Sequence, residues 1–401
     1  MSKVAIFTMG TRGDVQLYIY LARKLIENGI DTILGTHPYW KDLIEKAGVK
    51  FVPIGSNINI EREMAAIRGN GANPMSMGRE LDFISDFFQD ATHDILNACK
   101  GRDLVVVSHS LIGAVEAQAL GIPTVNVTIQ KDAIPEKLRQ QSVSEKVLEN
   151  IGSSRIIKPY NNLRKIYGLR PIKFIDELMS DKLNLMPISR TVNDRNPYWE
   201  AKNVVTGFWY EDDMDFVPDE KLRTFMETGD KAVVLSFGAM NYEDDAEVEK
   251  LDKYIKAFEA TDTKAIIQGF QRSLATNYKL PDKIMSCGDV PHSWLFSRAR
   301  YVIHHCGFGT CTATMVYGVP SIPIPYMPEQ IRYAAKLNDI GIATKMVKTS
   351  KVSKRAIMDV LDEMNSSYYF KKEKAEDISK KVRAENGLDD AVRRIKDILH
   401  G

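Results

Sequence analysis

Several features that would assign a function at once are scarce in this sequence. Only four cysteines occur in 401 residues, and Cys99, Cys287, Cys306 and Cys311 form no CxxC pair. They therefore read as reduced thiols and not as a disulfide framework. The formal net charge is +1, so no basic excess predicts a nucleic-acid partner and no acidic excess predicts a solvating tail.

Long apolar runs are absent as well. No stretch reaches the roughly 20 apolar residues needed to span a bilayer. The first eight residues lack the apolar core and the cleavage site of an export signal. We expect a cytoplasmic protein without a transmembrane segment, and peripheral membrane contact remains open.

Two common nucleotide-binding motifs are missing too. The glycine fingerprint GxGxxG does not occur, residues 10–13 do not substitute for it, and there is no Walker-type GK[ST] loop. The acidic run at residues 212–215 follows no candidate strand and is typical of a solvated turn. We therefore expect no metal site.

What is present is an alternation of apolar, strand-length runs with helical segments, which occurs twice. Such strands, covered by helices on both faces, predict a parallel sheet. Two series in succession predict an α/β protein with two Rossmann-like, doubly wound domains. The expected strands are residues 4–8, 32–34, 49–54, 104–107 and 123–127, and then 231–237, 265–268, 301–304 and 321–324.

Ligands of such sheets bind beyond the carboxyl ends of the strands, so the loops after the strands are the candidate sites. The strongest local pattern is His304-His305-Cys306-Gly307-Phe308-Gly309-Thr310, which follows a strand and begins a helix. Glycines allow close backbone approach, and a helix start offers free N–H groups to an anion. The pattern suits a diphosphate, and a glycine-rich turn with a packing histidine is the alternative.

With this turn, other segments resemble the donor site of family 1 glycosyltransferases of the GT-B fold, in which two Rossmann-like domains face each other across a cleft. The segment from Asp289 to Phe296 (DVPHSWLF) and the His304-His305 pair are most similar to the sterol glucosyltransferase and antibiotic glycosyltransferase branch. Further matching segments are Gly10-Thr11-Arg12-Gly13-Asp14, Val205-Thr206-Gly207-Phe208-Trp209, Ser236-Phe237-Gly238-Ala239-Met240, Gly318-Val319-Pro320 and Glu385-Asn386-Gly387-Leu388.

The resemblance implies an organisation of the whole chain. Residues 1–206 would form the acceptor-binding domain, 207–224 an interdomain linker and 225–384 the nucleotide-sugar donor domain. Residues 385–401 would form a C-terminal helix that packs back on the first domain.

The resemblance also assigns the donor side. Val290 would contact the base through its backbone, and His305 would bind the diphosphate. Glu329 and Gln330 would hold hydroxyls of the sugar, with an exposed helix start as the alternative for both. The remaining donor-binding residues would be Gly238, Ala239, Gly307, Phe308, Gly309 and Thr310.

On the acceptor side, the resemblance implies that Asp14 is the general base, with Gly13 and Arg12 near the active site. A plain helix N-cap is the alternative for Asp14. His109 follows the strand at residues 104–107 and is a second catalytic candidate, as a partner of Asp14 or an acceptor contact; a structural histidine is its alternative. The apolar stretch at residues 64–88 would line an acceptor pocket or form a helix core.

The expected enzyme moves a hexose, by expectation glucose, from a UDP-sugar to a hydroxyl of a lipophilic molecule such as a sterol, with inversion and without a cofactor. Alternatives are a TDP-deoxysugar transferase, a nucleotide-sugar epimerase or hydrolase, and a non-catalytic binding protein. Four positions depart from the family pattern. Cys306 stands where the family usually has a glycine, as it also does in the plant branch, whereas Ala239, Ala313 and Glu329 leave the phosphate, ribose and sugar contacts open.

Overall fold

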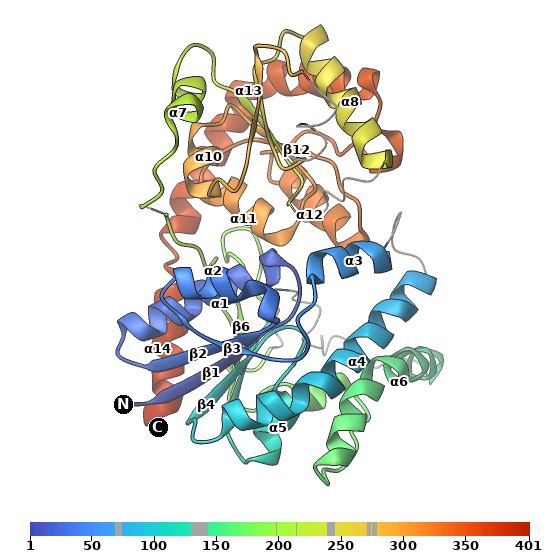
Figure 1. Cartoon of the computed structure of the whole chain (residues 1–401), viewed down its shortest axis with the longest axis vertical. Helices are drawn as coiled ribbons and strands as arrows, with labels where there is room; N and C mark the ends of the chain where they lie inside the picture. The colour runs from blue at the N-terminus through green and yellow to red at the C-terminus, as the bar shows by residue number, and fades with distance from the viewer. Residues whose placement is uncertain are drawn as a thin grey trace. The chain divides into compact units, whose positions relative to one another are not determined.

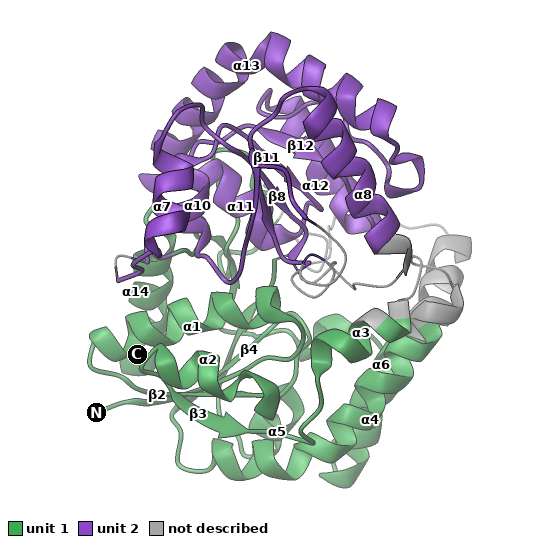
Figure 2. Cartoon of the chain, turned by 45° about the horizontal axis from the view of Figure 1, so that its top comes forward, with its two compact units in different colours: residues 1–210, 385–401 green, residues 211–384 purple. Residues whose placement is uncertain are grey.

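The computed structural model describes residues 1–68, 74–129, 143–197, 199–213, 215–238, 245–270, 274 and 279–401. The chain folds into two compact units, coloured separately in Figure 2. Unit 1 comprises residues 1–210 together with 385–401, and unit 2 comprises residues 211–384. The second unit is therefore inserted into the first along the chain.

Unit 1 contains a parallel seven-stranded sheet in the order β3-β2-β1-β4-β5-β6-β7 (Figure 1). In β1, Val4 pairs with Thr32 on one side and Leu104 on the other. The strands are β1 Lys3–Phe7, β2 Asp31–Thr36, β3 Lys50–Pro53, β4 Leu104–Val107, β5 Thr124–Val127, β6 Leu183–Met186 and β7 Asn203–Val205.

Both faces of this sheet are buried. Val4 and Ile6 of β1 join one hydrophobic core, and the alternating residues Ala5 and Phe7 join a second. This follows from the period of two along a strand and explains the continuous apolar run. The unit 1 helices are α1 Arg12–Glu27, α2 Lys41–Lys46, α3 Ile60–Arg68, α4 Pro74–Cys99, α5 Ala114–Ala119, α6 Val143–Ile166 and α14 Gly387–His400.

Helices α1 and α14 lie side by side on the first of these cores (Figure 1). The apolar spacing along α1 places one stripe inward, and Gly29, with φ of +77°, follows its end. Helix α14 contributes Leu388, Ala391, Val392 and Ile395 to the same core.

Unit 2 contains a parallel five-stranded sheet in the order β10-β9-β8-β11-β12. The strands are β8 Val233–Ser236, β9 Ala265–Gln268, β10 Ile284–Cys287, β11 Val302–His304 and β12 Ser321–Pro323. The helices are α7 Glu220–Glu227, α8 Asp245–Ala260, α10 His292–Arg298, α11 Phe308–Val316, α12 Pro328–Asp339 and α13 Lys354–Arg383.

The two sheets share one topology at their centres. In each, the first strand of the unit lies between its second and fourth strands, so the winding reverses between β1 and β4 and between β8 and β11. Ligands of open α/β sheets bind at such reversal points. The predicted fold of two Rossmann-like, doubly wound α/β units is confirmed. None of the described helices combines the length and hydropathy required to cross a bilayer.

Candidate functional site

Asp14 lies in the first turn of α1, immediately beyond β1. Its Oδ2 accepts hydrogen bonds from the Thr11 backbone N–H at 2.8 Å and from the Thr11 hydroxyl at 3.1 Å. Its Oδ1 lies 3.6 Å from Nε2 of His109. The carboxylate therefore caps its own helix with one oxygen and offers the other to a neighbour.

The turn before Asp14 is fixed by contacts from other elements. Gly10 has φ of +124°, and a Cβ atom there would collide with the Asp14 carboxylate. The Trp40 indole N–H donates to the Gly10 carbonyl at 3.0 Å, and the Thr8 hydroxyl donates to the Asp14 carbonyl at 3.0 Å. Trp40 follows β2, and the sequence carried no signal that it would reach this turn.

His109 lies in the loop after β4, on the other side of the reversal point from Asp14. Its side chain is 30% exposed and that of Asp14 is 26% exposed, so both are open to solvent. The loop is held by a hydrogen bond of 2.8 Å between the hydroxyls of Ser108 and Ser110. The Tyr160 hydroxyl donates to the Ser110 carbonyl at 2.7 Å. The structure thus brings Asp14 and His109 together, whereas Arg12 and Gly13 are exposed at the start of α1.

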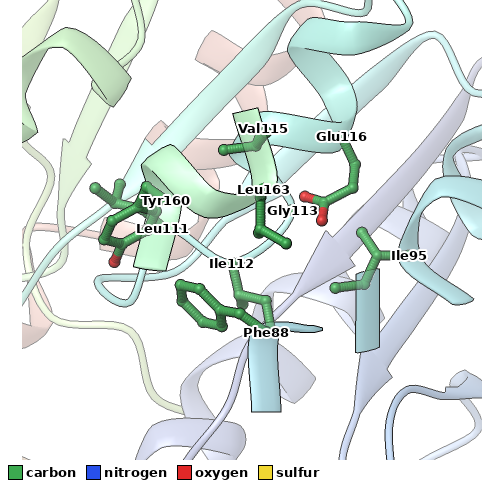
Figure 3. Close-up of a pocket in the computed structure, with 9 residues that line it drawn as sticks. All are labelled: Phe88, Ile95, Leu111, Ile112, Gly113, Val115, Glu116, Tyr160 and Leu163. Carbon is green, nitrogen blue, oxygen red and sulfur yellow. The ribbon is translucent and has the colours of Figure 1, made fainter. Parts of the chain in front are cut away.

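A narrow pocket lies behind this loop, and it leaves no room for a water molecule (Figure 3). The usual range for ligand pockets starts near ~300 Å³. Of the stretch at residues 64–88, Phe88 lines the pocket, while Met64 and Phe87 are core residues. The side chains of Met75 and Met77 lie outside the described residues. The lining residues are Phe88, Ile95, Leu111, Ile112, Gly113, Val115, Glu116, Tyr160 and Leu163.

In unit 2, the turn between β11 and α11 carries His305. A Cβ atom on Gly307, the N-cap residue of α11, would overlap the His305 ring, so glycine is what allows this packing. Cys306 has φ of +64°, a conformation that favours glycine, and its backbone N–H donates to His304 Nδ1 at 3.1 Å. His304 is fully buried, and this bond gives it a structural role in the turn.

His305 itself is 9% exposed. Burial, reinforced by the neighbouring charges of His304 and His292, lowers the pKa of His305 to about 3. The ring is therefore neutral near pH 7 and can donate from one nitrogen only. It can still act as a hydrogen-bond donor to an anion, next to the free N–H groups at the start of α11.

Other predicted donor residues surround this ring or follow it. Gly238 lies two residues beyond the end of β8 with φ of +51°, and a Cβ atom there would lie 3.3 Å from His305 Cε1. Gly309 is exposed, Thr310 is 6% exposed, and the Phe308 ring centroid lies 6.0 Å from that of Tyr333. Ala239 lies outside the described residues.

Val290 already has partners for its backbone. Its N–H donates to the Gly288 carbonyl at 2.9 Å, and its carbonyl accepts from Gln268 Nε2 at 2.7 Å. Gln268 Oε1 in turn accepts from the Ser236 hydroxyl at 2.9 Å. Gln268 thus ties β8 to the loop after β10, a positioning role that the sequence analysis missed. The sequence feature that could have indicated this role is a polar residue at the end of an otherwise apolar strand.

Glu329 and Gln330 lie in the first turn of α12. Gln330 is 3% exposed, and its Oε1 accepts from the backbone N–H groups of Tyr326 at 2.8 Å and Met327 at 3.2 Å. Gln330 is therefore a buried helix cap, not an exposed residue, and its amide oxygen is committed to the backbone of the turn. Glu329 is half-buried beside it.

Comparison with known proteins adds three findings. Residues 4–127 match the glycosyltransferase family 28 N-terminal domain. A sterol 3-beta-glucosyltransferase of Komagataella phaffii is 28% identical over 425 residues, covering 98% of this chain and 34% of that protein. One of Debaryomyces hansenii is 28% identical over 422 residues, covering 97% of this chain and 26% of that protein. The chain thus spans about a third or less of the length of these relatives.

Solved structures of antibiotic glycosyltransferases share the fold. The glycosyltransferase of kitacinnamycin superposes with a TM-score of 0.77 at 15% identity, covering 99% of both chains. VinC, solved in complex with DTDP, gives a TM-score of 0.74 at 19% identity, again with 99% of both chains. The resemblance to these two groups of glycosyltransferases, expected from the motifs, is confirmed.

Proposed function

We propose that this protein is a glycosyltransferase that moves a hexose from a nucleotide-sugar to a hydroxyl group of a lipophilic acceptor, with a UDP-sugar as donor and a sterol as the first acceptor class. One observation carries the proposal. The reversal point of unit 1 presents a carboxylate oxygen of Asp14 beside His109, and the equivalent point of unit 2 presents a glycine-lined helix start beside His305.

The turn at the start of α11 suits a diphosphate. The N–H groups at the start of α11 have no helical acceptors, and the helix dipole there favours negative charge. The neutral His305 ring adds one donor, and no side chain at Gly307 or Gly309 blocks the approach. Charge that develops on the leaving diphosphate would be stabilised by these fixed donors.

The Asp14 carboxylate in unit 1 suits deprotonation of an alcohol. As the acceptor oxygen bonds to the anomeric carbon, the bond from that carbon to the diphosphate oxygen breaks and the hydroxyl proton passes to Asp14 Oδ1. Displacement from the opposite face inverts the anomeric centre. Because Oδ2 is held by Thr11, Oδ1 keeps a fixed position for this transfer. His109 would orient Oδ1 or share the proton.

Similarity to sterol 3-beta-glucosyltransferases over 97–98% of the chain supports glucose as the sugar and a sterol as the acceptor. The narrow pocket behind the His109 loop does not hold the acceptor in this proposal, because it leaves no room even for a water molecule. All four cysteines are free and buried, which fits a reducing compartment such as the cytoplasm.

The proposal is tested by donor binding and transfer on the same sample. Thermal unfolding is measured with UDP, TDP and GDP, since a ligand of the native state raises Tm by mass action. UDP is expected to give the largest rise. UDP-glucose is then incubated with a sterol, with a macrolide, or with no acceptor, and the products are separated.

Glucosylated sterol is the expected product. A preference for TDP and a macrolide would change the proposed donor to a TDP-sugar and the proposed acceptor to a macrolide. Release of glucose without an acceptor would show that the enzyme is a hydrolase and not a transferase. No Tm response to any of the three nucleotides would overturn the proposed function.

A further inference from the structure

The turn at His305 contains a second set of chemical groups that phosphate binding does not use. One ligand atom each of His304, Cys306 and Cys311 lies within 4.8 Å of the others. His304 and Cys306 are fully buried and Cys311 is 3% exposed. His304 Nε2 has no hydrogen-bond partner, although it is enclosed by protein. A buried imidazole and two thiols in contact need an explanation beyond packing.

Their chemistry matches a thiophilic metal ion. Two thiolates and one imidazole are the ligand types that Zn²⁺ prefers, and three protein ligands leave a fourth position open. Tetrahedral Zn²⁺ with Zn–S bonds of about 2.3 Å places neighbouring ligand atoms roughly 3.5–3.8 Å apart. The ligand atoms therefore need to approach one another by about 1.3 Å at most. Two thiolates would neutralise the 2+ charge, which a buried site requires.

We propose that His304, Cys306 and Cys311 form a Zn²⁺ site whose occupation opposes donor binding at the neighbouring turn. Binding releases one proton from each thiol as two Zn–S bonds and one Zn–N bond form. The effect on the donor rests on the proposed function, whereas binding of the ion does not.

The antagonism follows from the hydrogen bond between Cys306 N–H and His304 Nδ1. An imidazole that binds a metal through Nδ1 loses that acceptor. One that binds through Nε2 carries its hydrogen on Nδ1, which then cannot accept either. Either way the bond breaks and the Cys306 backbone moves. Since His305 is packed against Gly307 without spare room, this movement shifts the phosphate-binding ring.

Metal binding is tested first, with the full chain in a non-thiol reductant. Co²⁺ serves as a spectroscopic probe, because thiolate ligands give an intense charge-transfer band, and Zn²⁺ is expected to displace it with one equivalent per chain. The variants Cys306→Gly and Cys311→Ala are expected to lose the band. Glycine suits the φ of +64° at position 306, so that variant should fold. Cys287→Ala, which removes a buried cysteine of the strand β10, is the matched control and should keep the band.

Donor antagonism is then measured as the Kd of UDP with and without saturating Zn²⁺. We expect Zn²⁺ to weaken UDP binding about tenfold in the wild type and in Cys287→Ala, and to leave the Kd of Cys311→Ala unchanged. A missing thiolate band in the wild type, or one that persists in both cluster variants, would overturn the site. UDP affinity that is indifferent to bound Zn²⁺ would overturn the antagonism. A thiolate band in a protein that binds no nucleotide at all would support the metal site and reject the proposed function.

Discussion

The carboxylate of Asp14 divides its two oxygens between different partners: Oδ2 accepts two hydrogen bonds from Thr11, and Oδ1 lies 3.6 Å from His109 Nε2. The position of Asp14 is therefore compatible with both sequence-based interpretations, a helix cap and a candidate base. The hydrogen bonds from Thr11 to Oδ2 fix the position of Oδ1.

Replacing Asp14 by asparagine tests the base. The amide oxygen of Asp14→Asn can still accept from Thr11, so the helix start should survive while the proton acceptor is lost. We expect kcat to fall by about 100-fold or more with the Kd of UDP unchanged. Asp42→Asn, at the first turn of α2, is the control. Near-normal turnover of Asp14→Asn would remove Asp14 from the proposed chemistry.

A double substitution tests whether His109 works through Asp14. If both side chains serve one proton transfer, Asp14→Asn combined with His109→Ala should be no slower than Asp14→Asn alone. His109→Ala by itself is expected to reduce kcat by roughly tenfold, within the range of general acid–base effects. Fully multiplicative losses in the double variant would show that His109 acts independently, as an acceptor contact or a structural residue.

The packing of His305 predicts unequal effects at two glycines of one turn. A methyl group at Gly307 would overlap the His305 ring, whereas nothing lies within 4 Å of a Cβ atom at Gly309. We expect Gly307→Ala to weaken UDP binding by about tenfold or more, equivalent to roughly 1.4 kcal/mol, and Gly309→Ala to weaken it far less. Calorimetric titration with UDP measures both. Equal losses would mean that the His305 ring is not what the donor needs.

The buried carboxyl of Glu116 is expected to lower the stability of the fold at neutral pH, so that removing its charge should raise it. Burial raises the pKa of Glu116, opposed by its hydrogen bond from Thr92, and its Oε2 has no partner. Below the ordinary value of 4.5 the group is protonated in both the folded and the unfolded chain. As pH rises, the unfolded chain ionises first, so a penalty on folding accumulates until the raised pKa is passed.

Glu116→Gln should therefore raise Tm at neutral pH by a few degrees and leave it unchanged near pH ~4. Thermal unfolding across this pH range measures the difference. Glu27→Gln, at a carboxylate that is 54% exposed, is the control and should show no such trend. A uniform change in Tm at all pH values would indicate packing and not ionisation.

Glu385 holds the start of the C-terminal segment to the rest of unit 1. Its Oε1 accepts from the Ser189 hydroxyl at 2.9 Å and from the Thr191 N–H and hydroxyl, each at 2.8 Å. We expect Glu385→Ala to reduce the free energy of unfolding by about 2 kcal/mol, since hydrogen bonds to a charged group are among the stronger ones. Denaturant unfolding compares it with Glu373→Ala at an exposed position of α13. Equal midpoints for the two variants would contradict this role.

The sequence predicted the central strands well because their burial on both faces leaves unbroken apolar runs. The predicted strands 104–107 and 265–268 coincide with β4 and β9. It missed β6, β7 and β10, which are three or four residues long, and the 30-residue helix α13. The inward residues of α13, among them Ile357, Val360, Leu361 and Met364, follow helical spacing, but a largely polar surface hides them.

The sequence could predict which loops lie next to each other at the strand ends, but not the side-chain contacts between distant elements. Topology places the loops after β1 and β4 next to each other, and the structure does bring Asp14 and His109 together. Their chemical roles stay predictions. The Trp40 bond to Gly10 and the bridge through Gln268 depend on the packed arrangement of several elements, which no local pattern records.

The division of the chain affects the order in which it can fold during synthesis. Unit 2 is one continuous segment, so every residue it needs has been made when Ala384 leaves the ribosome. Unit 1 still lacks α14 at that moment, and with it Leu388, Ala391, Val392 and Ile395 of a core that begins at Val4. The strand β1 and the helix α1 must therefore wait, with part of their apolar surface uncovered, for residues 385–401 to emerge and close that core.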